Sequence, residues 1–313
     1  MVYTGDVRSE QNADRDAAYR YIERIAPKDA RRNEPLSRHT TLGVGGPADL
    51  WIKPRTVGAA LDVLSFCQRE SVPHMALGRG SNVLVSDSGW RGAVVNLSRC
   101  FRRYRPVAGG VTCGAGLSLP RLVRRLAGDG FSGLEWAGGI PGTVGGAVVV
   151  NAGAHGAEMS GVVKRIVAMV EGERRLLGKE TIAFSYRAAE APGIVLEVEF
   201  ELNEAVPELA REKIEHLMSV RERTQPLSKR TAGCIFKNPP GDSAGRIIDS
   251  LGLKGVVAGA ARVSELHANF IVNEDDATAA DVFSLIRRVK ERVRGETGVQ
   301  LELEVELIGD FAQ

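Results

Sequence analysis

Apolar residues recur along this chain with two different periods, one typical of helices and one typical of strands. Helical spacing predicts helices at 57–70, 118–128, 205–222, 244–250 and 277–293, preceded by a short helical pattern at 17–25 that ends at Pro27. Apolar or alternating runs predict strands at 48–53, 163–170, 194–202, 268–272 and 301–307. Ser118 and Pro120 are typical of a helix start, as N-cap and first-turn residues. The pattern therefore predicts an α+β fold.

The order of these elements predicts more than one domain, since 313 residues exceed the usual single core. Residues 1–35 are expected to form a peripheral arm, and two β-rich units follow at 36–110 and 111–204. Strands dominate up to about residue 204. From the helix predicted at 205–222 onward, helices and strands alternate. Residues 205–313 are therefore expected to form an α+β unit of their own.

Glycine is most concentrated between Gly133 and Gly156, where eight residues of GLEWAGGIPGTVGGAVVVNAGAHG are Gly. Such density indicates backbone at positive φ or in close approach to another surface. Successive free N–H groups in such a loop form a site for an anion, and the apolar run 147–150 is expected to lead into a strand. The stretch predicts a phosphate or pyrophosphate cradle, with a glycine-rich turn between two sheets as the alternative.

A second loop of small residues lies between two strand-like runs and comprises Gly78, Arg79, Gly80, Ser81 and Asn82. It lacks the G-x-G-x-x-G pattern and no helix is expected after it, so a Rossmann site is disfavoured; no Walker A pattern occurs either. The loop is either a further set of backbone donors or a plain hairpin. Two such loops in adjacent units suit a dinucleotide between them, and the missing fingerprint favours a flavin over free nicotinamide.

Composition and charge narrow the function classes. The chain has 43% hydrophobic and 26% charged residues and a formal charge of +2, which disfavours nucleic-acid binding. No apolar run approaches the roughly 18 residues of a membrane span, so no membrane association is expected and the composition is typical of a cytoplasmic protein. The five histidines and four cysteines lack metal-ligand or C-x-x-C spacing, so neither a metal site nor a disulfide framework is predicted.

Three polar groups are candidates for chemistry: Arg187 in FSYR, Cys234 in TAGCIFKNPPG, and an acid in LELEVEL. Cys234 lies between a small-residue turn and a proline break, where a thiol is expected to face a cavity. Strict alternation puts residues 301, 303, 305 and 307 on one strand face and the glutamates on the other. A surface ion pair for Arg187, and solvated faces for the glutamates and for Lys237 and Asn238, are the plainer alternatives.

Several motifs together resemble one family. GVGGPAD, LGRGSNVLVSD, AGGIPGTVGGAVVVNAGAHG, SYR, AGCIFKNP with AGRIIDSLGLKG, HANFIVN and GVQLELEVELIG, in this order over about residues 36–310, resemble the UDP-N-acetylenolpyruvoylglucosamine reductases (MurB) of bacterial peptidoglycan synthesis. The resemblance implies an FAD-binding domain of the vanillyl-alcohol-oxidase type in two subdomains, 36–110 and 111–204, and a substrate-binding domain at 205–313. It also implies the shorter branch of the family, without an extra tyrosine-bearing loop.

The resemblance implies non-covalently bound FAD, NADPH as co-substrate and the enolpyruvyl ether of UDP-N-acetylglucosamine as substrate, and we expect a monomer. It assigns Arg187 to the substrate carboxylate, Glu304 as an assisting acid and Cys234 as proton donor. The residues expected at FAD are Gly78, Arg79, Gly80, Ser81, Asn82, Gly116, Gly139, Ile140, Thr143, Gly145, Gly146, Asn151, Ala152 and Gly153; those expected at substrate are Tyr186, Lys237 and Asn238.

Three positions depart from the family pattern: Cys234 replaces the usual serine, His155 a common tyrosine, and Leu266 a lysine. Since a free thiol titrates near about 8.5, Cys234 is expected to be a more acidic donor than serine. Two other functions stay open. One is a flavin-dependent sugar or alcohol oxidase of the same fold, with His155 as a covalent flavin anchor, and the other is a nucleotide-binding scaffold without catalysis.

Overall fold

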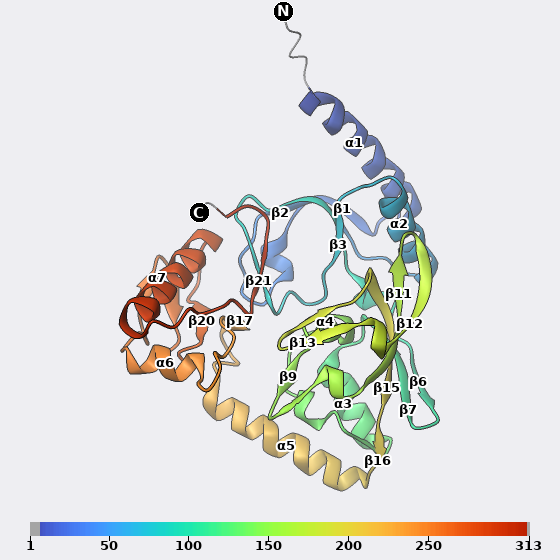
Figure 1. Ribbon diagram of the computed structural model, residues 1–313. Helices are drawn as coiled ribbons and strands as arrows, with labels where there is room; N and C mark the ends of the chain where they lie inside the picture. The colour runs from blue at the N-terminus through green and yellow to red at the C-terminus, as the bar shows by residue number, and fades with distance from the viewer. Residues whose placement is uncertain (1–6, 312–313) are drawn as a thin grey trace, which may run out of the picture.

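A computed structural model describes residues 7–311 of the chain, and three lobes follow one another along it (Figure 1). The first lobe holds a four-stranded sheet in the order β1-β2-β5-β3, in which β1 is antiparallel to β2 and the other pairs are parallel. Its elements are α1 (Val7–Ile25), β1 (Ala30–Pro35), β2 (Pro47–Ile52), α2 (Val57–Arg69), β3 (His74–Ala76), β4 (Val83–Val85) and β5 (Trp90–Val95).

The second lobe is built on an antiparallel five-stranded sheet in the order β12-β11-β15-β7-β6. Its helices cover the large apolar core that this sheet shares with the long glycine stretch. The elements are β6 (Tyr104–Val107), β7 (Gly110–Gly114), α3 (Leu119–Gly128), β8 (Phe131–Ser132), α4 (Val144–Val149), β9 (Gly153–Ala154), β10 (Ala157–Glu158), β11 (Val163–Val170), β12 (Glu173–Gly178), β13 (Ala183–Ser185), β14 (Ala188–Glu190), β15 (Ile194–Glu201) and β16 (Asn203–Glu204).

The third lobe packs two helices against a four-stranded sheet in the order β17-β20-β19-β18. A long helix, α5, leads into it and lies along α3 of the second lobe (Figure 1). The elements are α5 (Pro207–Thr224), β17 (Arg230–Cys234), α6 (Ala244–Ser250), β18 (Val257–Ala258), β19 (Ala261–Val263), β20 (Phe270–Asn273), α7 (Ala279–Thr297) and β21 (Glu306–Ile308). Short 3₁₀ helices occur at 36–39, 97–99, 135–137, 159–161 and 179–181.

The predicted helices and most predicted strands are confirmed within a few residues, except that α1 begins ten residues before the predicted pattern at 17–25; this supports the α+β fold class. Ser118 is at the N-cap of α3 with a proline in the first turn, but its side chain accepts no capping hydrogen bond. The plain hairpin considered for residues 78–82 is wrong, because β3 pairs with β5 and β4 with β21. The division into an arm and three domains stays a prediction; the buried Tyr19, Ile22 and Ala26 pack onto the first lobe.

The apolar run 147–150 does not lead directly into a strand as expected: it ends the helix α4, and only the two-residue strand β9 follows. Thr143 caps the helix by accepting a hydrogen bond from the N–H of Gly146 at 3.4 Å. Gly145 is needed for close packing, since a Cβ there would lie 2.7 Å from the Cβ of Ala115. Of the five glycines between 138 and 146, Gly142 alone has a positive φ, +137°. Close approach is therefore the main reason for the glycines here.

The expected strand at 301–307 is also wrong in extent, because the segment changes partner midway. Leu303 forms an isolated bridge with Phe236 of the third lobe, and Glu306 then starts β21, which is parallel to β4 of the first lobe. The alternation is confirmed only for part of the segment, since Leu301 and Val305 are buried but Leu307 is exposed. The last strand thus connects two lobes.

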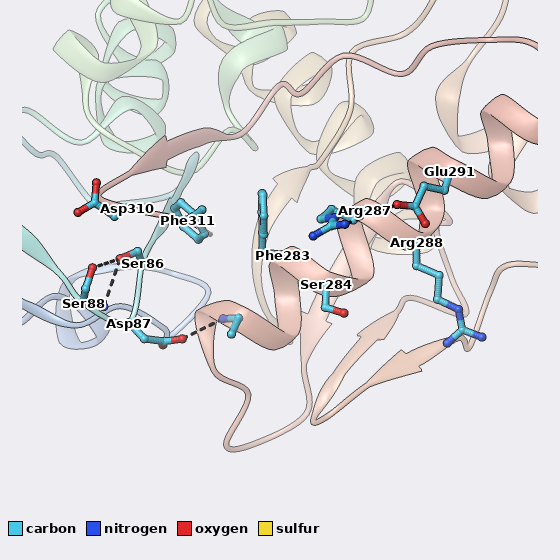
Figure 2. Close-up of a pocket in the computed structure, with 11 residues that line it drawn as sticks. Ser86, Asp87, Ser88, Phe283, Ser284, Arg287, Arg288, Glu291, Asp310 and Phe311 are labelled. Carbon is cyan, nitrogen blue, oxygen red and sulfur yellow. Dashed lines mark hydrogen bonds and ion pairs between the residues drawn. The ribbon is translucent and has the colours of Figure 1, made fainter. Parts of the chain in front are cut away.

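Asp87 provides a second link between these lobes, from the loop after β4 to the first turn of α7. Its two carboxylate oxygens accept hydrogen bonds from the N–H groups of Ala279 and Ala280, each at 2.9 Å. Figure 2 shows this contact at the edge of a pocket of about 500 Å³, where Phe283 and Phe311 face each other. None of the residues lining this pocket is a predicted site residue.

We expect Asp87→Ala to lower the free energy of unfolding by about 1–2 kcal/mol, because it removes an anionic acceptor from two helix N–H groups. Urea unfolding followed by circular dichroism would measure the loss. Asp276→Ala is the matched control, since Asp276 is an exposed carboxylate next to the same helix and its side chain makes no hydrogen bond or ion pair within the described residues. Equal unfolding midpoints for the two variants would contradict the assigned role.

Candidate active site

Arg187 and Glu304, 117 positions apart in sequence, lie side by side. The Nε of Arg187 is 3.1 Å from Oε1 of Glu304. The N–H of Glu304 donates to the carbonyl of Ile235 at 2.8 Å, so the segment that carries the acid runs next to Cys234. The three candidate catalytic residues therefore converge where the second and third lobes meet.

Arg187 is placed by a tight hairpin between β13 and β14. Ser185 pairs with Ala188, which leaves Tyr186 and Arg187 as a two-residue turn with Arg187 at φ +60°. The guanidinium of Arg187 lies 5.1 Å from the ring centre of the exposed Tyr186. It also lies against Gly153, where a Cβ would be 2.6 Å from Nη1. The glycine at 153 thus makes room for the arginine.

Cys234 ends β17, next to Gly233 at φ +82° and a break in the strand register. The following residues are held by the buried Asn269, whose amide accepts from the N–H of Phe236 at 2.9 Å and donates to its carbonyl at 2.8 Å. Cys234 keeps partial exposure, and the cavity expected beside its thiol stays a prediction.

The surroundings of Cys234 and Glu304 favour their neutral forms. Desolvation raises the pKa of Cys234 to about 12, with a further contribution from the charge of Glu304 against those of Arg187 and Arg221. The expectation of a donor near about 8.5 is therefore corrected, because the expectation ignored burial. Burial also raises the pKa of Glu304, although the adjacent Arg187 acts in the opposite direction. The thiol of Cys234 is therefore suited to hold its proton at neutral pH.

Arg221 was missed by the sequence reasoning, although it lies in the same region. Its Nε is buried without a hydrogen-bond partner, and desolvation lowers its pKa. Its side chain covers Gly139, where a Cβ would be 2.6 Å from Cδ. The sequence could not single out Arg221, because α5 carries many charged residues and nothing in the pattern distinguishes this one.

The predicted substrate residues Lys237 and Asn238 follow Cys234 directly. Lys237 is partly buried, with Nζ 3.8 Å from an oxygen of Glu302, and its charge acts on Glu304. The side-chain oxygen of Asn238 accepts from the N–H of Ala244 at 3.0 Å and so supports the start of α6. Lys237 is therefore paired with Glu302 at 3.8 Å, and Asn238 is partly engaged within the protein.

The two glycine loops contact each other. Ser81 Oγ donates to the carbonyl of Pro141 at 2.9 Å, and a Cβ on Gly78 would lie 2.5 Å from Oγ1 of Thr143. Asn82 donates its amide to the carbonyl of Glu304 at 3.0 Å. Gly80 has φ +60° and leaves no space for a Cβ beside the carbonyl of His39. The backbone of these loops, more than the Ser81 and Asn82 side chains, is free to serve a ligand.

Beside the loops lies an open cleft of about 530 Å³, which Gly78, Arg79, Gly116 and Thr143 line together with other residues. Five cationic side chains border the cleft, no carboxylate lines it, and none of the five forms an ion pair among the described residues: Arg38, Lys53, Arg79, Arg102 and Arg121. His39, which also lines the cleft, stacks on Trp51 with ring centres 3.7 Å apart. Cations without partners around a glycine-lined cleft fit a phosphate-rich ligand such as a dinucleotide.

Sequence reasoning found Arg79 in this cleft but missed the other four cations, which lie in separate elements with no common motif. The remaining predicted cofactor residues belong to the glycine stretch, around α4 and β9. Gly139 and Ile140 precede α4, Gly145 and Gly146 lie in its first turn, and Ala152 and the fully buried Asn151 follow it. Their roles toward a cofactor stay predictions.

Comparison with known proteins places this geometry in a family. Residues 48–172 match the family model described as FAD binding domain, and residues 225–308 match the C-terminal domain of UDP-N-acetylenolpyruvoylglucosamine reductase. UDP-N-acetylenolpyruvoylglucosamine reductase from Bacillus velezensis is 42% identical over 281 residues, covering 88% of this chain and 93% of its own length. The Bacillus subtilis protein of the same name is 42% identical over 282 residues, again 88% and 93%.

The chain belongs to the UDP-N-acetylenolpyruvoylglucosamine reductase family.

A solved structure of this family agrees with the fold. The crystal structure of MurB from Thermus caldophilus has a TM-score of 0.78 and 39% identity, and the match covers 90% of this chain and all of that one. The expectation of an α+β fold with an FAD-binding domain is confirmed, and residues 225–308 match the C-terminal domain of the reductase. Across the described part of the chain, no helix combines the length and the apolar character needed to cross a membrane.

Proposed function

We propose that this chain reduces UDP-N-acetylglucosamine enolpyruvate to UDP-N-acetylmuramate, with NADPH as reductant and non-covalently bound FAD, during peptidoglycan precursor synthesis in the cytoplasm. The observation that carries the proposal is the convergence of Arg187, Glu304 and Cys234 beside the glycine loops. Family membership supports the same reaction class. A function in making cell-wall precursors would link the protein to cell shape and division.

The residues of the cleft fit FAD. Backbone N–H groups of the loops at 78–82 and 139–146 are suited to the pyrophosphate, and the unpaired cations of the cleft supply the matching charge. Gly116, which lines the cleft, could not carry a side chain there because a Cβ would lie 2.1 Å from the carbonyl oxygen of Leu97. When bound, FAD would supply the redox chemistry that passes hydride from NADPH to the vinyl carbon of the substrate.

Protein groups handle the charge that hydride addition creates on the substrate. Negative charge develops on the carbon next to the ether oxygen and on the carboxylate, where the guanidinium of Arg187 offers fixed donors. Glu304 holds Arg187 in place through their ion pair and is proposed to assist in orienting the intermediate. Cys234 then gives its proton to that carbon, since its thiol is protonated at neutral pH.

The diphosphate and nucleoside of the substrate are proposed to bind near Tyr186, Lys237 and Asn238. Tyr186 is next to Arg187 and keeps 47% of its surface exposed. Lys237 and Asn238 are placed beside Cys234 and are proposed to contact the diphosphate and nucleoside. We further propose that the chain belongs to the shorter branch of the family, without an additional tyrosine loop over the substrate, and acts as a monomer.

An anaerobic titration tests the function. NADPH should bleach the flavin absorbance of the purified protein, and UDP-N-acetylglucosamine enolpyruvate should restore it promptly. Bleaching without return would favour the oxidase or scaffold alternatives. His155, the covalent anchor of the oxidase alternative, is exposed at the tip of the β9–β10 hairpin. Acid denaturation should release the yellow colour from the protein; retention would support that anchor.

A further inference from the structure

Asn151 is fully buried, and both ends of its amide are used within the protein. Its Nδ2 donates to the carbonyl of Ser185 at 2.9 Å. Its Oδ1 accepts from the N–H of Ser160 at 2.9 Å. Ser185 is the residue at which the hairpin turn that carries Arg187 begins. The side chain therefore serves this hairpin, and the expected role of Asn151 beside the cofactor stays a prediction.

The hairpin needs such support because its turn is strained. Arg187 has φ +60° and Asn151 itself φ +41°, a left-handed conformation that costs a residue with a Cβ roughly 1–2 kcal/mol. Asparagine tolerates this conformation better than most residues, but arginine does not. Strained residues persist only where their surroundings fix them, and they gather at functional sites.

The segment after Asn151 also contacts the guanidinium of Arg187. Gly153, two residues on, lies under the guanidinium, where a Cβ would meet Nη1 at 2.6 Å. Glu304 holds the guanidinium from the opposite lobe, 3.1 Å from Nε. The amide of Asn151 thus fixes the backbone of the turn, and the backbone next to Asn151 sets where the guanidinium lies.

We propose that Asn151 is a positioning residue for Arg187: by holding the carbonyl of Ser185 it fixes the strained turn that aims the guanidinium at the substrate carboxylate. The inference rests on the proposed function of Arg187 and deepens it. Since the proposed partner of Arg187 is the substrate and not NADPH, Asn151 should matter more for the return of the flavin absorbance than for its bleaching.

Asn151→Asp tests the inference, since it keeps the size and the acceptor but replaces the N–H donor by an oxygen facing the carbonyl of Ser185. A misplacement of about 1 Å costs on the order of 10²-fold in rate, so we expect the substrate-dependent return to slow by about 10–100-fold. Bleaching by NADPH, measured per bound flavin, should slow much less than the return.

Asn273→Asp is the matched control. Asn273 is a buried asparagine of the third lobe that donates to the carbonyl of Leu42 at 3.0 Å and accepts from two N–H groups. The same exchange of donor for oxygen there should leave both half-reactions within about twofold. Equal slowing of bleaching and return in Asn151→Asp would overturn the inference, because it would indicate a general effect on cofactor binding.

Two further measurements separate this inference from the proposed function. In the Arg187→Ala background, Asn151→Asp should cause no additional loss of return rate, and multiplied losses would overturn the inference. Hydrogen exchange needs no substrate: amides of residues 183–190 should exchange about tenfold faster in Asn151→Asp and not in Asn273→Asp. Unchanged exchange overturns the inference, whereas failure of the parent protein to return its absorbance overturns the proposed function.

Discussion

Cys234→Ala is expected to slow the substrate-dependent return of the flavin absorbance by about 10²–10⁴-fold, the usual contribution of a general acid. Alanine offers no proton to the carbon that bears the ether oxygen, while Arg187 and Glu304 stay in place. Bleaching by NADPH requires no proton from Cys234 and should continue at the parent rate. Stopped-flow absorbance under anaerobic conditions measures both half-reactions separately.

Cys234→Ser is the matched variant, because it restores a donor of similar size and should retain turnover. The pH profile provides a further check. With a pKa of about 12, the thiol keeps its proton as pH rises from 6 to 10, so its titration should cause no loss of return rate in that interval. Normal return in the alanine variant would remove Cys234 from the donor role, whereas a fall in rate centred near about pH 8.5 would contradict the raised pKa of its thiol.

Gly116→Ala is expected to yield protein with little bound flavin and with unfolding free energy lower by about 1–3 kcal/mol. The added Cβ would lie 2.1 Å from the carbonyl oxygen of Leu97 and 2.8 Å from Cα of Ser98, so two backbone segments of the cleft must separate. The ratio of flavin to protein absorbance after purification, together with urea unfolding, measures both effects.

Gly161→Ala serves as its control, since Gly161 has no positive φ and no heavy atom lies within 4 Å of the position that a Cβ would take there. This variant should retain flavin and the parent stability. If Gly116→Ala also purifies with full flavin content, the cleft at Gly116 is not where the dinucleotide binds.

Periodicity was sufficient to predict helices such as α2 and α6 because their apolar spacing is regular and their ends are marked. It failed at α4, because the run from Ala147 to Val150 is too short and too uniformly apolar to show a helical period. The helix there is stabilised by the Thr143 cap and by close packing. Periodicity failed at 301–305 because the partner of that segment changes from one lobe to another. Local pattern contains no information about such a change.

The candidate site was predictable only in part. The glycine loops could be recognised from their high glycine content, and the roles of Arg187, Cys234 and Glu304 were assigned by resemblance to the family. Their convergence depends on contacts between lobes, such as the pairing of Arg187 with Glu304. The raised pKa of Cys234 and the buried amide of Asn151 follow from burial, which sequence alone does not specify.

The parallel pairing of β21 with β4 has a consequence for how the protein is made. Glu304 lies just before β21, and Asn82 of the first lobe donates to its carbonyl. On a ribosome, both glycine loops and Arg187 leave the exit tunnel before Glu304 is synthesised, and domains fold from the N-terminus as they emerge. The cleft lined by the glycine loops can thus form first during synthesis. Glu304 reaches its position later, when β21 pairs with β4 of the already folded first lobe.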